Sequence, residues 1–159
     1  MNYLLEIYQE WGRDVIGKEL FNVNGLVYVY ETPDLEHPQQ LQLIFSGINR
    51  EISFRCGKDG ATLALTELPM QESDLGEYGK EVIMSMSESC LFCRYLGRIV
   101  SKVSVIYSDA EKAIVGIKLV FDGELDLIII NLGDELNIFD SFPLQYEQEE
   151  GIHYLEILA

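Results

Sequence analysis

Basic residues are scarce in this sequence of 159 residues. Eleven lysines and arginines stand against 27 aspartates and glutamates, which gives a formal net charge of −16 at pH 7. A surface of that sign repels the phosphates of nucleic acids and the head groups of anionic lipids. We therefore expect neither nucleic acid nor a membrane as a direct partner.

Long hydrophobic runs and a secretory signal are also absent. The longest apolar stretch, residues 125–132, contains Asp126 and falls far short of the 18 or more residues that a membrane span requires. Glu6 and Glu10 stand where a signal peptide would be apolar. Three cysteines, an odd number, fit a reducing compartment better than a disulfide framework. We expect a soluble, cytoplasmic protein.

Residue sets typical of catalysis are missing. The two histidines, His37 and His153, stand beside no recognisable serine or cysteine motif. Asp134 and Glu135 form a carboxylate pair, but glycine-flanked acids between strands are ordinary turn residues. No glycine-rich phosphate-binding pattern occurs in the chain. We predict that the protein is not an enzyme and has no catalytic residue.

The spacing of Cys90 and Cys93 suits a metal or a redox pair, but supplies only half of either site. A zinc site would also need Cys56, His37 or His153, which come from separate segments. We therefore predict no metal and no cofactor. Cys90 and Cys93 are interpreted as reduced structural residues, of which one or both pack with Phe92 under a short helix.

Apolar residues make up 48% of the chain, the proportion of one globular domain, and we expect residues 1–159 to form it. Tyr3, Tyr8 and Trp11 share a helical spacing with Leu4 and Ile7, and this predicts an opening helix that Gly12 ends or weakens. From Gly17 onward a two-residue period predicts strands, with a turn at Asn24-Gly25. Alternating positions predict a core that contains Tyr28, Phe45, Phe54, Leu65, Val105, Leu119, Phe121, Ile128 and Ile130.

The second half of the chain resembles the first. Gly17-Lys18 matches Gly97-Arg98, and residues 41–47 match residues 117–123. These matches favour an internal repeat of residues 1–69 and 81–143, with residues 70–80 as an acidic linker. The predicted fold is thus α+β and β-rich, with mainly antiparallel sheets from two similar helix-plus-four-strand units packed as one domain.

Charge is unevenly distributed along the chain. Beyond Lys118 the sequence holds ten acids and no base, and a second base-free acidic window runs from Asp59 to Gly79. A concentrated negative field steers a basic partner, and aromatics such as Phe139, Phe142, Tyr146 and Tyr154 would supply the buried anchors of the interface. The predicted partner-binding residues are Asp122, Glu124, Asp126, Asp134, Glu135, Asp140, Phe142, Tyr146, Glu147, Glu149 and Glu150. The alternative is a solvated acidic face that serves solubility.

The small size, the acid-rich last third and segments such as residues 115–123 followed by residues 131–135 carry a family resemblance. In these features the chain resembles the immunity proteins of bacterial contact-dependent growth inhibition and other polymorphic toxin systems. The resemblance implies a non-catalytic inhibitor that binds a basic toxin stoichiometrically, the toxin being an RNase (such as a tRNase) or a DNase. It transfers no residue by position.

Two other classes of function stay open. A duplicated β unit can form a cleft between its halves, which would suit a small-molecule-binding or adaptor module. An enzyme would have to use Asp134, Glu135 or the Cys90 and Cys93 pair.

Overall fold

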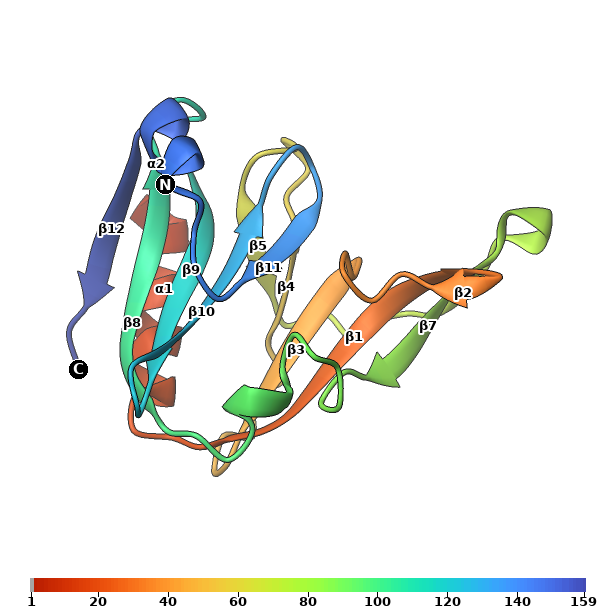
Figure 1. The fold of residues 1–159 in the computed structure, drawn as a ribbon, viewed down its shortest axis with the longest axis horizontal. Helices are drawn as coiled ribbons and strands as arrows, with labels where there is room; N and C mark the ends of the chain where they lie inside the picture. The colour runs from red at the N-terminus through yellow and green to blue at the C-terminus, as the bar shows by residue number, and fades with distance from the viewer. Residues whose placement is uncertain (1) are drawn as a thin grey trace.

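The computed structural model describes residues 2–159 and consists of two antiparallel sheets and two α-helices, which confirms the β-rich α+β class (Figure 1). Helix α1 (Asn2–Val15) opens the chain and the short helix α2 (Leu144–Glu150) lies near its end. Among the described residues, no helix is long and apolar enough to cross a membrane.

The first sheet is a four-stranded meander extended on one side. Its central strand β1 pairs with β3, and then β4 and β5 follow in chain order. On the other side of β1 lies β7, which in turn pairs with β6, while β2 pairs with the end of β1. The strands are β1 (Leu20–Tyr30), β2 (Thr32–Pro33), β3 (Gln40–Phe45), β4 (Ser53–Cys56), β5 (Leu63–Thr66), β6 (Ser73–Asp74) and β7 (Lys80–Ser85).

The second sheet has the order β11-β10-β9-β8-β12, which matches β5-β4-β3-β1-β7 of the first sheet strand for strand. Both sheets contain a meander of four strands, and in both a further strand pairs antiparallel with the first strand of that meander. The strands are β8 (Val100–Ser108), β9 (Ala113–Phe121), β10 (Leu125–Asn131), β11 (Leu136–Phe139) and β12 (Ile152–Ile157).

The two sheets meet where β1 and β8 begin. Glu19 and Ile99 form an antiparallel bridge, and four backbone hydrogen bonds surround it. These bonds form two matching pairs: each bond from the first half to the second has an equivalent bond from the second half to the first. The corresponding residues are Gly17 and Gly97, Lys18 and Arg98, and Leu20 and Val100. They run from Gly17 N to Val100 O, Gly97 N to Leu20 O, Leu20 N to Arg98 O and Val100 N to Lys18 O, at 2.8–3.0 Å.

Helix α1 packs against both sheets and completes their shared core. The Trp11 ring lies edge-on to Phe45 and Phe54, and the buried Tyr8 hydroxyl donates a hydrogen bond to Leu63 O at 2.7 Å. The helix also contacts β8 and β12 of the second sheet. One continuous cluster of buried side chains thus joins both sheets and α1, and burial of this apolar surface is the main stabilising contribution.

Gly12 does not end α1, which continues to Val15, so this expectation is wrong. A Cβ at Gly12 would lie 2.7 Å from Ile157 Cδ1. The glycine therefore lets the helix approach β12 closely.

The turn expected at Asn24-Gly25 is also absent, because β1 runs through both residues. Gly25 pairs with Leu41 of β3 and with Met84 of β7, and a strand that has partners on both sides cannot fold back there. Seven of the nine predicted core residues are buried, and Tyr28 and Leu65 are half-buried.

The second half lacks a counterpart of α1. The stretch before Gly97 forms only the 3-10 turn η2 (Cys93–Tyr95), and the predicted acidic linker contains β6 and the 3-10 turn η1 (Gly76–Tyr78). Phe92 is fully buried, but Cys90 and Cys93 are exposed, so their predicted packing is wrong.

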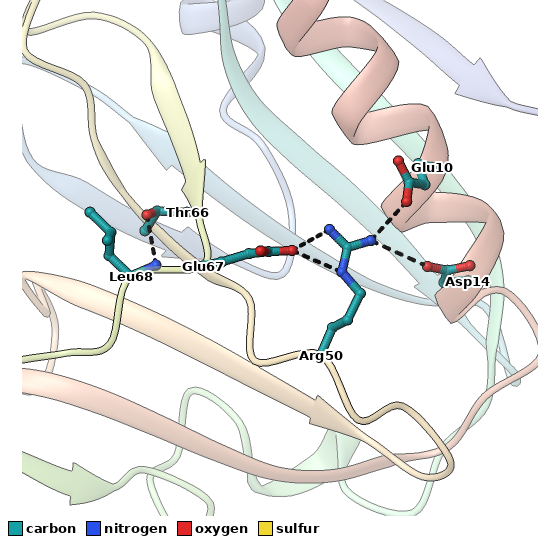
Figure 2. Close-up of polar contacts among 6 residues, drawn as sticks. All are labelled: Glu10, Asp14, Arg50, Thr66, Glu67 and Leu68. Atoms are coloured by element: carbon teal, nitrogen blue, oxygen red, sulfur yellow. Dashed lines mark hydrogen bonds and ion pairs between the residues drawn. The ribbon is translucent and has the colours of Figure 1, made fainter.

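The exposed side chain of Arg50 links α1 to the first sheet through ion pairs (Figure 2). Its guanidinium donates to Glu67 at the end of β5 and to Glu10 of α1, each at 2.9 Å, and Asp14 lies 4.0 Å away. The hydrogen bond with Glu67 raises the pKa of Arg50. These acids are neutralised within the molecule.

Candidate partner-binding surfaces

The structure divides the predicted partner-binding residues among separate places. Asp122 and Glu124 lie in the β9–β10 turn beside the sheet junction, where Asp122 N donates to Ile99 O. Asp134 and Glu135 lie in the next turn, at the opposite end of β10. A strand of seven residues separates these turns by about 20 Å. Consecutive turns of a meander alternate between ends, so one acidic stretch of sequence does not form one surface.

Two predicted acids meet on the outer face of the second sheet. Asp126 lies 3.6 Å from Lys118 Nζ, which sits 5.0 Å from the centre of the Tyr154 ring. The Tyr154 hydroxyl donates to Glu147 of α2. Burial, and then the contact with Glu147, raise the pKa of Tyr154. We call the group Asp126, Tyr146, Glu147, Glu149 and Tyr154 the α2 surface.

Phe142 packs over other apolar side chains and is not part of an exposed binding surface. Its ring lies 5.8 Å from that of Phe139 and 6.1 Å from that of Tyr146, between centroids. Phe139 and Phe142 pack on an apolar cluster on the outer face, which consists of Ile106, Val115, Ile128 and Ile130. Of the predicted aromatics, Tyr146 and Tyr154 are exposed.

Asp140 and Glu150, the last residue of α2, have hydrogen-bond partners of their own. Asp140 Oδ2 accepts a hydrogen bond from Arg94 of η2 at 2.6 Å. Glu150 Oε2 accepts one from the buried Ser108 hydroxyl at 3.2 Å.

The acidic β10–β11 turn meets the first sheet in a small pocket of about 270 Å³. His37 Nδ1 lies 3.2 Å from Glu135 Oε1, and Cys56 of β4 lines the same pocket with Asp134. Burial, and then the charges of Asp134 and Glu135, raise the pKa of Cys56 to about 11. The thiol is therefore protonated at neutral pH, which disfavours a nucleophilic role.

No signal in the sequence predicts the meeting of His37 and Cys56 with Asp134 and Glu135. The four side chains come from the β2–β3 loop, from the end of β4 and from the β10–β11 turn, which lie in different halves of the chain. Among residues 2–159, no group of three histidine, cysteine, aspartate or glutamate side chains gathers closely enough to hold a metal ion.

A further surface lies on the first sheet, outside the predicted set. The end of β1 with β2, β6, η1 and β7 extends away from the second sheet (Figure 1). There Tyr28, Tyr30, Glu77 and Tyr78 line a common hollow, in which the Tyr28 hydroxyl donates to Tyr78 O. Tyr30 is 55% exposed and Tyr78 is 68% exposed.

Acids surround these tyrosines, and we call Tyr28, Tyr30, Tyr78, Glu77 and Glu81 the arm surface. Glu31, Glu72 and Asp74 lie close by and line a neighbouring hollow with Glu81. In the part of the chain that the structure describes, none of these five acids lies within 4.0 Å of a lysine or arginine nitrogen. The alternation of Val27-Tyr28-Val29-Tyr30 and the acidic window that ends at Gly79 are the sequence signals of this surface.

Comparison of the chain with models of known protein families, with curated protein sequences and with solved structures returned no significant match.

Proposed function

We propose that this chain is a non-catalytic cytoplasmic protein that binds and neutralises a strongly basic partner, a nuclease toxin of the kind that the family resemblance implies. The observation that carries the proposal is negative charge left without partners. Five of the 27 carboxylates, on Glu10, Asp14, Glu67, Asp126 and Asp140, lie within 4.0 Å of a lysine or arginine nitrogen in the described chain. The remaining field attracts cations over a Debye length, about 8 Å at physiological salt.

Exposed tyrosines lie within this field on both sheets. Tyr146 and Tyr154 stand beside Glu147 on the α2 surface, and Tyr30 and Tyr78 stand beside Glu77 on the arm surface. Aromatic side chains that are exposed among like charges suit a binding interface, where tyrosine contributes contact area and the acids speed association. A face that served solubility alone would have no use for exposed rings.

The geometry gives less support to the other classes of function. The pocket at Cys56 is polar, and its volume of about 270 Å³ lies just below the usual range for a small-molecule site. The two hollows beside Tyr28 and Tyr30, of about 760 and 610 Å³, are large enough but are wide open to solvent and would bury little of a small ligand. A protonated Cys56 thiol and the exposed Cys90 and Cys93 do not form the nucleophile and base pair that an enzyme requires.

The proposal includes an architecture of two similar units related by an internal duplication. The equal strand orders, the hydrogen bonds that recur between equivalent residues of the two halves and the bulges after Leu20 and after Val100 support it. Beside those bulges, Leu20 pairs with Phe45 and Val100 pairs with Phe121. Unlike the predicted units, only the first carries a long helix.

The test of function begins from the gene adjacent to the one that encodes this chain. The C-terminal domain of its product is expressed in a bacterial host with and without this chain. We expect growth arrest by that domain alone and protection by co-expression. A domain that arrests growth equally with and without this chain contradicts the proposal.

Binding kinetics then test the role of charge. Association of the two purified proteins is measured at 50 and 300 mM salt for the wild type and for Glu147→Lys with Glu149→Lys. Glu147→Gln with Glu149→Gln is the matched control that removes charge without reversing it. We expect association to slow with salt, and to slow more for the lysine variant than for the glutamine variant. Association that ignores both salt and these substitutions would show that the acids are only a solvated face.

A further inference from the structure

We infer that the arm surface is a docking site for an extended, arginine-rich segment of a protein partner. The inference rests on the proposed function only for the sign of the partner's charge. The arm surface is uncovered, hydrogen bonds hold it in place, and its chemistry selects one occupant.

The corresponding part of the second sheet is covered by the chain itself. In the β1–β7 pair Tyr28 lies opposite Glu81, and in the β8–β12 pair Ser108 lies opposite Ile152 at the matching place. Ser108 is fully buried, and its hydroxyl donates to Glu150 O at the end of α2. In the first sheet the matching contact comes from the shorter 3-10 helix η1, whose Tyr78 O accepts from the Tyr28 hydroxyl, and this turn leaves Tyr30 and Tyr78 exposed.

The segment that crosses the outer face of the first sheet does not cover the tyrosines either. Residues 68–70 pass beside Asn24, Gln42 and Ser53, nearer to the sheet junction. Tyr30 and Tyr78 therefore remain open to a partner.

Hydrogen bonds hold the arm surface in one arrangement. The Tyr28 hydroxyl donates to Tyr78 O, and Ser73 Oγ donates to Glu81 Oε1 at 2.6 Å. Ile83 N, on the open edge of β7, donates to the Glu72 carboxylate at 2.8 Å. A surface that is ordered before binding loses little conformational entropy when a partner docks.

Charge selects the occupant. Lys80 is the one base among the residues that line the two hollows of the arm, which also include five acids. A second copy of this chain would bring another net charge of −16 and would be repelled. An arginine-rich segment fits best, since a guanidinium stacks on a tyrosine ring and donates in a fork to a carboxylate, whereas lysine offers only a point charge.

The test uses two synthetic peptides of equal charge, acetylated and amidated hexa-arginine and hexa-lysine. Each is titrated into the ¹⁵N-labelled protein at 150 mM salt, and binding is followed by amide chemical shifts. We expect the hexa-arginine shifts to concentrate on residues 28–31 and 72–83. Hexa-arginine should bind roughly threefold or more tightly than hexa-lysine, the range expected for a cation over an exposed ring.

Substitution of the exposed tyrosines separates stacking from simple charge attraction. Tyr30→Ser with Tyr78→Ser should weaken hexa-arginine about fivefold and leave hexa-lysine little changed. The matched control is Tyr3→Ser on α1, since Tyr3 is 77% exposed and lies outside the arm. The dispersion of the amide spectrum shows whether each variant is folded.

Three outcomes of the peptide titrations would overturn the inference. They are shifts centred on the α2 surface, equal affinity for the two peptides, and equal binding by the arm variant and the Tyr3 control. None of them bears on the co-expression test, which fails only when the wild-type chain gives no protection. An arm variant that protects as well as the wild type would likewise count against the docking site while the proposed function stands.

Discussion

The two sheets have the same strand order but differ on their outer faces. In the second sheet Ile106, Val115, Ile128 and Ile130 form an apolar cluster, and Phe139 and Phe142 pack over it. In the first sheet the outer face carries Gln40, whose side-chain amide donates to Ser53 Oγ at 2.5 Å, and the exposed tyrosines of the arm. The same strand order can therefore carry an outer face that the chain itself covers or one that stays exposed, and the outward-facing residues decide which.

The second sheet and the arm of the first sheet also differ in how their acids are compensated. Asp126, Asp140 and Glu135 of the second sheet each lie within 4.0 Å of a basic side chain, namely Lys118, Arg94 and His37. In the described chain no lysine or arginine lies within 4.0 Å of the five acids in and beside the arm surface, which are Glu31, Glu72, Asp74, Glu77 and Glu81. Surface pairs of this kind contribute little to stability. Their consequence is that the second sheet offers a weaker field to a partner than its acid count suggests.

The strongest test of this comparison concerns the inner faces, which should behave alike. Phe45 and Phe121 occupy matching places beside the sheet junction, and both are buried in the shared core. Each change to alanine should lower the free energy of unfolding by about 3–5 kcal/mol, because a buried phenyl ring is lost and a cavity is left.

Urea unfolding followed by fluorescence and by circular dichroism measures both variants. We expect one transition that coincides for the two probes, as for a single domain. Separate transitions for the two sheets, or a change in unfolding free energy below about 0.5 kcal/mol for either variant, would show that the two inner faces do not share one core.

The second test concerns the place where the two sheets touch. Burial, and after it the charges of Asp134 and Glu135 of the second sheet, raise the pKa of Cys56 in the first sheet from 9.0 to about 11. Below pH 9 the thiolate fraction, and with it the rate of alkylation, should be roughly a hundredfold lower than for a free thiol. The exposed Cys90 and Cys93 should react first.

Mass spectrometry of the iodoacetamide-treated protein at pH 8 gives the three rates. Asp134→Asn with Glu135→Gln should raise the rate of Cys56 severalfold, and urea-unfolded protein serves as the control in which the three thiols become similar. If Cys56 reacts as fast as Cys90 in the folded wild type, the hairpins of the two sheets are not in contact.

The smallest effects should come from the outer faces, and these should differ. Phe142 is half-buried against Phe139 and the apolar cluster, whereas Tyr30 is exposed. Phe142→Ala should cost about 1–2 kcal/mol of unfolding free energy, less than a fully buried ring, and Tyr30→Ala about 0.5 kcal/mol or less. Thermal and urea unfolding of the two variants provide the measurement, and equal costs would mean that the two faces are covered alike.

Much of the fold could be predicted from local patterns. A helical spacing from Tyr3 to Trp11 and a two-residue period in segments such as residues 41–45 and 117–121 depend only on which neighbours face the same way. The failures at Gly12 and Asn24-Gly25 share one cause. Both sites look like breaks locally, and contacts with distant strands override that preference.

The candidate site was less predictable, since a binding surface depends on which distant segments are neighbours. The acidity of the chain, the even spacing of its strands and the matches between its halves are determined by the sequence alone, because charge and alternation are properties of the residues and of short stretches of backbone. Only the tertiary structure decided that the turns at Asp122 and Asp134 lie at opposite ends of β10, that Lys118 neutralises Asp126, and that Tyr30 and Tyr78 stand exposed among unpaired acids. The physical reason is that pairing register and chain crossings are long-range contacts, and these contacts select which charges are compensated and which side chains are covered.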